Sequence, residues 1–342
     1  MCPDRAEGTS RRSGNPSADV FLGEFVEPEN QPAVLTTSEL AVRLLTTCSG
    51  GDVDTAEFYV SKLGYRKIRK YCRAIEHRTS YQSVVIENAQ QLILFDQALQ
   101  AALLRGIGTI ELQFRAAYSR FMADEHGPFA HRHRENFQKD EHFEKFLEDY
   151  GRELGYKIRN GNRHVRASFE EYGDLPIWEA VDLMPLGTLS KLYRNTRSKD
   201  IRRAVADTFG CKYEFLTSWL RTICEVRNRC AHFDDVCITP LVCRPKKIPG
   251  VNAQNDTAFY AALVVQRLIE GSDAAIFDVV SEQHYTSFAN EFVSIADKMQ
   301  PIVFKAAGFP PNWMNLMVQA STIINGLTVS TSKLVSAVDY PA

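Results

Sequence analysis

Long apolar runs are missing from this sequence, and no stretch of about 18 residues is apolar enough to cross a lipid bilayer. The first residues also lack the apolar segment of a secretory signal, so the sequence predicts a cytoplasmic protein without a membrane partner. Alternation of apolar and polar residues, which marks strands, is almost absent as well. This absence predicts an all-α fold.

A charge excess of one sign is absent too, because 40 Lys and Arg residues oppose 42 Asp and Glu residues. Binding of a nucleic acid would therefore require a local basic patch. The eight cysteines never occur as a pair separated by two residues, which is the usual unit of a structural zinc site. We therefore expect free thiols, no metal site and no cofactor.

The chain has 342 residues, enough for one large domain or two of ordinary size, and 44% of them are hydrophobic. Composition and helical periodicity divide it into a loosely ordered tail (1–32), an N-terminal helical subdomain (33–80), a helical core (81–245) and a C-terminal helical extension (246–342). Within the core, residues 131–172 form a highly charged insertion, which we expect to be a helical hairpin.

The most informative stretch is a predicted helix from Trp219 to His232. Its otherwise apolar pattern holds four polar side chains close together, namely Arg227, Asn228, Arg229 and His232. Burial of Arg and His without partners is unfavourable, so this cluster should border a cleft or an interface. Five positions of an ideal helix turn by about 500°, which leaves Arg227 and His232 about 140° apart. Either Arg227 reaches round on its long side chain, or the helix ends before His232.

These residue types suit the cleavage of RNA, whose 2′-hydroxyl supplies the nucleophile. A histidine can take and give a proton near neutral pH, and the planar guanidinium of an arginine matches the oxygens of a phosphate. One Arg and one His are too few for an acid, a base and a phosphate clamp. Two chains that meet at this helix in a symmetric homodimer would complete the set.

The alternative is structural. Arg227 and Arg229 would then pair with neighbouring carboxylates, and His232 would cap the helix. The carboxylates within reach are Glu225 and the Asp234–Asp235 pair.

Two further groups can serve the same chemistry. Basic and aromatic residues alternate between Tyr65 and Tyr71, where rings can stack on unpaired bases while Lys and Arg hold phosphates. The candidate RNA-binding residues are Tyr65, Arg66, Lys67, Arg69 and Lys70. A solvated basic face on a helix packed against the core explains the pattern equally well. On one or two helices predicted over 86–123, Glu111 and Arg115 form either a surface ion pair or, with Arg229, a support for the Arg–His cluster.

Nine short segments form an ordered set along the chain. They are Ala56–Ile68, Leu94–Leu99, Ile110–Arg115, His126–Pro128, Leu175–Trp178, Leu186–Tyr193, Ser218–Leu220, Val226–His232 and Gly308–Trp313. With these segments in this order, the chain resembles the Abi-like family, the AbiD/AbiF type of bacterial abortive-infection (anti-phage) proteins within the HEPN superfamily. The resemblance extends over roughly residues 37–318.

The resemblance implies a HEPN-type helical bundle with additional N-terminal helices, a role in phage defence, and a ribonuclease-type site at Arg227, Asn228 and His232. Two places depart from the family's pattern. Gln97 and Gln100 stand where the family commonly has basic residues. After the histidine the family usually continues with His and Arg-Leu-Trp-Asn, whereas residues 233–236 here are Phe, Asp, Asp and Val, which lowers the local positive potential.

Three functions follow. The first is a metal-independent endoribonuclease in which His232 is the acid and base, Arg227 stabilises phosphate charge and Asn228 has a positioning role. The second is a non-catalytic binder of a structured small RNA in a defence ribonucleoprotein, since related defence proteins are encoded near such an RNA in some lineages. A third is a protein–protein effector whose motif helix is only a dimer interface.

Overall fold

The computed structural model describes residues 33–48, 50–79, 84–276 and 298–322, together with positions 288, 292, 294 and 295. Every regular element in these residues is a helix, which confirms the predicted all-α class. The expected N-terminal tail (1–32) and the last part of the C-terminal extension (323–342) lie outside the described residues. Within the described part, no helix is both long enough and apolar enough to span a membrane.

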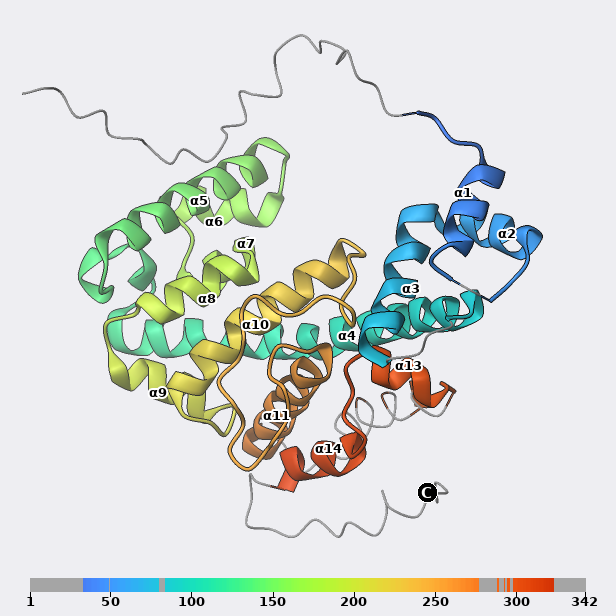
Figure 1. The fold of residues 1–342 in the computed structure, drawn as a ribbon. Coiled ribbons are helices and arrows are strands. Elements are labelled where there is room, and N and C mark those ends of the chain that lie inside the picture. The colour runs from blue at the N-terminus through green and yellow to red at the C-terminus, as the bar shows by residue number, and fades with distance from the viewer. Residues whose placement is uncertain are drawn as a thin grey trace, which may run out of the picture.

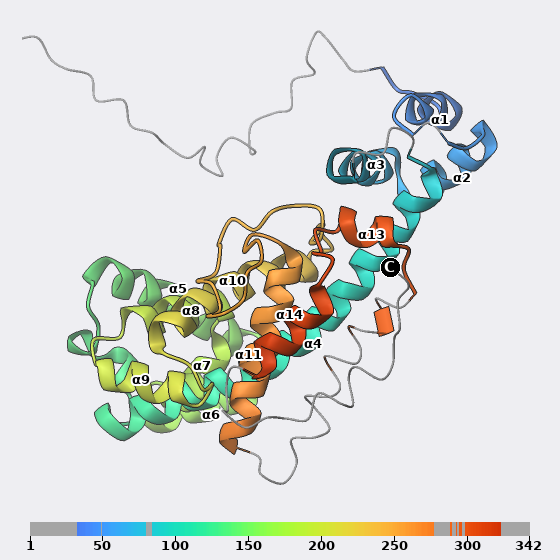
Figure 2. The same cartoon turned by 60° about the horizontal axis from the view of Figure 1, so that its bottom comes forward.

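The longest helix, α4 (Ile86–His126), runs through the middle of the molecule, and helices from both halves of the chain pack on it (Figures 1 and 2). The sequence predicts one or two helices here, and the structure has a single helix of 41 residues. At a rise of 1.5 Å per residue, it is about 60 Å long. It therefore joins two groups of helices that lie at opposite ends (Figure 2).

One end of α4 carries α1 (Thr37–Leu45), α2 (Val53–Leu63) and α3 (Tyr65–Thr79) (Figure 1). A capping box starts α1, because the Thr36 hydroxyl accepts from the Glu39 amide while the Glu39 carboxylate accepts from the Thr36 amide. Gly64, with φ 79°, separates α2 from α3. The chain turns there and sends the basic helix α3 back along the end of α4.

A disulfide joins Cys48, just after α1, to Cys72 in α3. The expectation of free thiols is therefore wrong for these two residues. Their Cα atoms lie 6.3 Å apart because α1 packs on α3, and this separation is within the range that a disulfide bridges. Five other cysteines in the described residues are free, namely Cys211, Cys224, Cys230, Cys237 and Cys243.

The other end of α4 carries α5 (Asp140–Arg159), α6 (Arg163–Tyr172), α7 (Ile177–Leu183), α8 (Leu186–Asn195) and α9 (Lys199–Asp207), preceded by the short 3-10 turns η2 (Ala130–Arg132) and η3 (Arg134–Asn136). In the charged insertion, α5 and α6 pack against each other. Two of its arginines are neutralised locally: Arg132 pairs with Asp174 at 2.9 Å, and Arg134 pairs with Asp140.

Along the middle of α4 lie α10 (Tyr213–Ala231) and α11 (Ala258–Ile276), followed by α13 (Pro301–Ala306) and α14 (Trp313–Thr322). A Cβ atom on Gly106 would come within 2.6 Å of a Val265 methyl carbon, so α4 and α11 approach closely at this glycine. Helix α10 runs from the α9 end of the molecule toward α3 (Figure 1). The residues at its C-terminal end, from Arg227 to His232, are called the Arg–His motif below.

Candidate functional site

Helix α10 ends one residue before His232, which answers the geometric question that the motif raises. His232 is the C-cap, with φ −96° and ψ 4°, and its backbone amide donates to the Asn228 carbonyl at 3.0 Å. The side chain of His232 is exposed, and no described residue bonds to its imidazole. The ring therefore stands at the end of the helix, open to a ligand.

Arg227 is half-buried, and its Nη1 donates to Oδ1 of the exposed Asn228 at 3.3 Å. No carboxylate among the described residues pairs with this guanidinium. Its charge does reach the Cys224 thiol: burial, and to a smaller extent Glu111, raise the pKa of this thiol to about 12, while Arg227 acts to lower it. Arg227 therefore keeps N–H donors for an incoming anion, with Asn228 beside it.

Arg229 has a structural role. Its guanidinium pairs with Glu225 at 2.5 Å and donates to the carbonyls of Thr239 and Pro240, both at 2.9 Å. The Glu225 carboxylate also accepts from the backbone amides of residues 242–243, at 3.0 and 2.6 Å. This pair holds the returning chain against α10. Arg229 therefore pairs with a neighbouring carboxylate, as the structural alternative predicts.

Phe233 follows the motif in the left-handed region, with φ 56°, and is the one non-glycine residue with positive φ in the described part of the chain. The residue is 78% exposed. The amide of the next residue, Asp234, donates back to the Arg229 carbonyl at 2.9 Å. This turn ends α10 and directs the chain toward α3.

A buried carboxylate on α4 fixes the segment that follows. Asp96 is fully buried and accepts from the backbone amides of Val236 and Cys237, the latter at 2.9 Å, and from the Tyr71 hydroxyl. Burial is the main cause that raises the pKa of the Cys237 thiol, and Asp96 raises it further. Buried carboxylates need such donors. The sequence reasoning missed Asp96, although an Asp directly after the apolar run 92–95 of a helix was a usable signal.

Gln100, one turn after Asp96, reaches the same segment. Its amide nitrogen donates to the Asp234 carbonyl at 2.9 Å and lies 3.3 Å from the Asp96 carboxylate. The neutral side chain stands where the resemblance leads one to expect a basic residue, and it contacts the loop that departs from the family's pattern.

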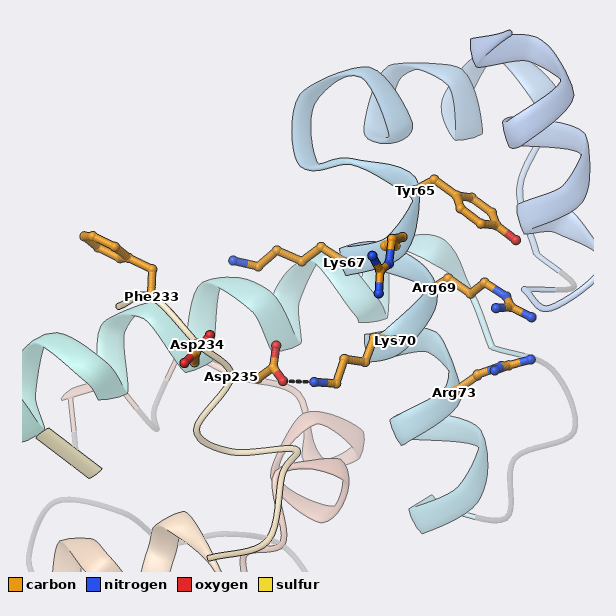
Figure 3. A pocket seen from close by; sticks show the side chains of 9 residues that line it. Tyr65, Lys67, Arg69, Lys70, Arg73, Phe233, Asp234 and Asp235 are labelled. Atoms are coloured by element: carbon orange, nitrogen blue, oxygen red, sulfur yellow. Dashed lines mark hydrogen bonds and ion pairs between the residues drawn. The ribbon is translucent and has the colours of Figure 1, made fainter. Parts of the chain in front are cut away.

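A pocket of about 420 Å³ lies between α3 and the turn after α10 (Figure 3). It is lined by Tyr65, Arg66, Lys67, Arg69, Lys70, Arg73, Phe233, Asp234 and Asp235. All five residues predicted to bind RNA are in this set. The structure therefore brings them to the segment directly after His232, although the two lie far apart in the sequence. We call this pocket the α3 groove.

The side chains of the α3 groove do not all face the same way. Lys67 and Lys70 extend toward the turn, where Lys70 pairs with Asp235, whereas Tyr65 and Arg69 point to the other side of α3 (Figure 3). The Arg69 guanidinium carbon lies 5.8 Å from the centre of the Tyr65 ring. The Tyr65 ring is therefore already covered in part by a cation. Five basic residues oppose two carboxylates in the groove, one of them already paired, so its charge is positive.

Glu111 and Arg115 form an ion pair on α4. Arg115 also donates to the carbonyls of Val181 and Met184, the latter at 2.8 Å, and so caps the C-terminal end of α7. Glu111 is close enough to the Cys224 thiol to raise its pKa. The pair therefore joins α4 to α7, and its acidic member lies near the part of α10 that carries Arg227.

The described residues contain no group of three or more His, Cys, Asp or Glu side chains placed to hold a metal ion.

A family model described as "Abi-like protein" matches residues 58–237, just over half of the chain. The chain belongs to the Abi-like protein family. No curated protein and no solved structure matches it.

The Abi-like region begins within α2 and ends at Cys237. It therefore contains the basic helix α3, the Asp96 hydrogen bonds and the whole Arg–His motif. Helices α11, α13 and α14 follow it in the chain. The residues that form the α3 groove all belong to the matched part of this Abi-like protein.

Proposed function

We propose that this Abi-like protein acts on RNA in defence against phage, as a metal-independent endoribonuclease of the HEPN type. Membership of the Abi-like family supports the role in defence. One observation supports the chemistry above the others: α10 ends with the accessible side chains of Arg227, Asn228 and His232, and the next residues line a positively charged groove.

The cleavage step uses the substrate's own 2′-hydroxyl. The imidazole of His232 takes the 2′-proton while that oxygen attacks phosphorus, and the bond from phosphorus to the 5′-oxygen breaks. A second imidazole protonates the leaving 5′-oxygen, so that the products carry a 2′,3′-cyclic phosphate and a 5′-hydroxyl. Arg227 stabilises the negative charge that builds on the phosphate oxygens, and Asn228 holds its guanidinium.

Each chain has one such His and one such Arg, so the full set of groups requires a homodimer in which two α10 ends meet over one RNA. The α3 groove of each protomer would then guide the strand toward the paired motifs. The protein would act in the cytoplasm, where such an RNA substrate is present. In this scheme Arg229 and the Glu111–Arg115 pair act only by holding α10 and its neighbours in place.

A second function is the binding of a structured small RNA without turnover. The observation that favours it is the Asp234–Asp235 pair, which places two carboxylates directly after the motif and weakens the attraction for a phosphate at that point. In this case Arg227 and His232 contact the RNA backbone and the bound RNA stays intact.

Purification of the protein from cells, followed by sequencing of the RNA that accompanies it, distinguishes these functions. Cleavage predicts fragments with 2′,3′-cyclic phosphate ends from the wild type and uncut RNA from His232→Ala. The same uncut RNA from both proteins would favour the binder. If neither retains RNA nor cuts it, the proposed action on RNA is wrong and the motif helix is left as a dimer interface.

A further inference from the structure

We propose that Phe233 is a stacking platform for a nucleobase, and that the α3 groove therefore takes single-stranded RNA in preference to duplex. This inference rests on the proposed function, because it names the form of RNA that the same groove accepts.

Phe233 contributes little to the stability of the fold. The residue is 78% exposed, so most of its apolar surface stays in water. Its backbone has φ 56°, a conformation that glycine and asparagine adopt readily and that a bulky side chain seldom takes. The turn after α10 would form at lower strain with either of those smaller residues. An exposed ring held in a strained conformation points to a role outside folding.

The conformation is held from both sides. Before the ring, the His232 amide donates to the Asn228 carbonyl at 3.0 Å; after it, the Asp234 amide donates to the Arg229 carbonyl at 2.9 Å. The Asp234 carbonyl in turn accepts from the buried Gln100 side chain at 2.9 Å. The ring is therefore presented from a fixed turn, so little backbone entropy is lost when a ligand stacks on it.

The surroundings of the ring suit a nucleotide. Phe233 lines the α3 groove together with exposed Arg66 and half-buried Lys67, and Lys67 extends from α3 toward the turn (Figure 3). A base can lie on the ring while the phosphates on either side of it meet these cations. Every base has such a face, but in a duplex it is stacked on its neighbours, so only an unpaired base can use the ring.

The test uses the full-length chain carrying His232→Ala, so that bound RNA stays intact, and compares Phe233→Gly with Phe233→Tyr. The probes are a fluorescein-labelled oligouridine and a blunt RNA duplex of equal length, with affinity measured by anisotropy at one salt concentration. Loss of one stacked base weakens binding of the oligouridine by roughly tenfold in Phe233→Gly. Binding of the duplex stays within about twofold, and Phe233→Tyr retains the affinity of the parent for both probes.

The unfolding temperature of Phe233→Gly serves as the control. Because glycine adopts φ 56° without strain, the variant should unfold at the same temperature as its parent or higher, so weaker binding cannot be attributed to unfolding. Equal affinity of Phe233→Gly and its parent for the oligouridine would overturn the stacking role and leave the RNA function standing. So would an equal loss for duplex and single strand. If the parent binds neither probe, the proposed function itself fails, and this inference fails with it.

Discussion

The carboxylate of Asp96 accepts a 2.9 Å hydrogen bond from the backbone amide of Cys237, which lies 141 positions later in the chain. This contact joins the longest helix to the segment directly after the Arg–His motif. Because Gln100 also holds the Asp234 carbonyl, the turn that follows His232 is attached to α4 at two points. The end of α10 and the groove beside it are thereby set by residues of α4.

Asp96→Asn tests this attachment. Asparagine keeps the shape but replaces one acceptor oxygen with a donor that faces backbone N–H groups, at a side chain that is fully buried from solvent. We expect the free energy of unfolding, measured in urea, to fall by about 2 kcal/mol. Asp200→Asn is the control, because Asp200 is exposed and pairs with Arg203 one turn away; it should change stability by less than about 0.5 kcal/mol. Equal effects of the two substitutions would contradict the role of Asp96.

Gly106→Ala and Gly108→Ala form a matched pair on the same helix. A Cβ at Gly106 would approach a Val265 methyl carbon to 2.6 Å, whereas a Cβ at Gly108 would meet nothing within 4 Å. We expect Gly106→Ala to destabilise the protein by about 1–3 kcal/mol through overpacking, and Gly108→Ala to stabilise it by up to about 1 kcal/mol through helix propensity. Thermal unfolding of both variants measures the difference. A stabilising Gly106→Ala would show that α4 and α11 do not cross closely there.

His131 makes the fold less stable at acidic pH. It is fully buried against the Tyr150 ring, with 5.3 Å between ring centres, and neither ring nitrogen has a hydrogen-bond partner among the residues that the structure describes. Burial lowers its pKa from 6.5 to about 4, opposed by Asp174 and assisted by Arg132. The folded state thus prefers the neutral ring. The contribution of the neutral ring to the free energy of unfolding is present in full above pH 6.5. It is lost as the pH falls toward 4, by roughly 3 kcal/mol at most.

His131→Phe removes this titration while it keeps an aromatic ring in the same place. Unfolding in urea at pH 7 and at pH 4.5 should show a smaller loss for the variant than for the wild type. His164→Phe, at an exposed position of α6, is the control and should keep the pH dependence of the wild type. The same loss of stability in His131→Phe and the wild type would rule out this histidine as the cause.

Periodicity in the sequence was enough to predict the helical class and several elements. The apolar pattern from Trp219 onward, for example, falls in α10. These are local features, which neighbouring residues determine. The end of α10 before His232 was one of two expected alternatives, and choosing between them needed the backbone.

The rest of the site depends on contacts between distant residues. Nothing local indicates that Asp96 accepts from the amides of residues 236–237, or that Arg229 faces the carbonyls of residues 239–240. The disulfide between Cys48 and Cys72 escaped prediction for the same reason, because it depends on how α1 packs on α3. The α3 groove combines two segments that the sequence marks separately. Only the packing of both on α4 shows that they meet.

The measurement that tests the central claim most directly is the cleavage rate of one defined single-stranded RNA, in the presence of EDTA, by the wild type, His232→Ala and His164→Ala. The account predicts cleavage by the wild type and His164→Ala to fragments with 2′,3′-cyclic phosphate ends, and a rate at least about 100-fold lower for His232→Ala with its unfolding temperature unchanged. Cleavage by His232→Ala at the wild-type rate would contradict it.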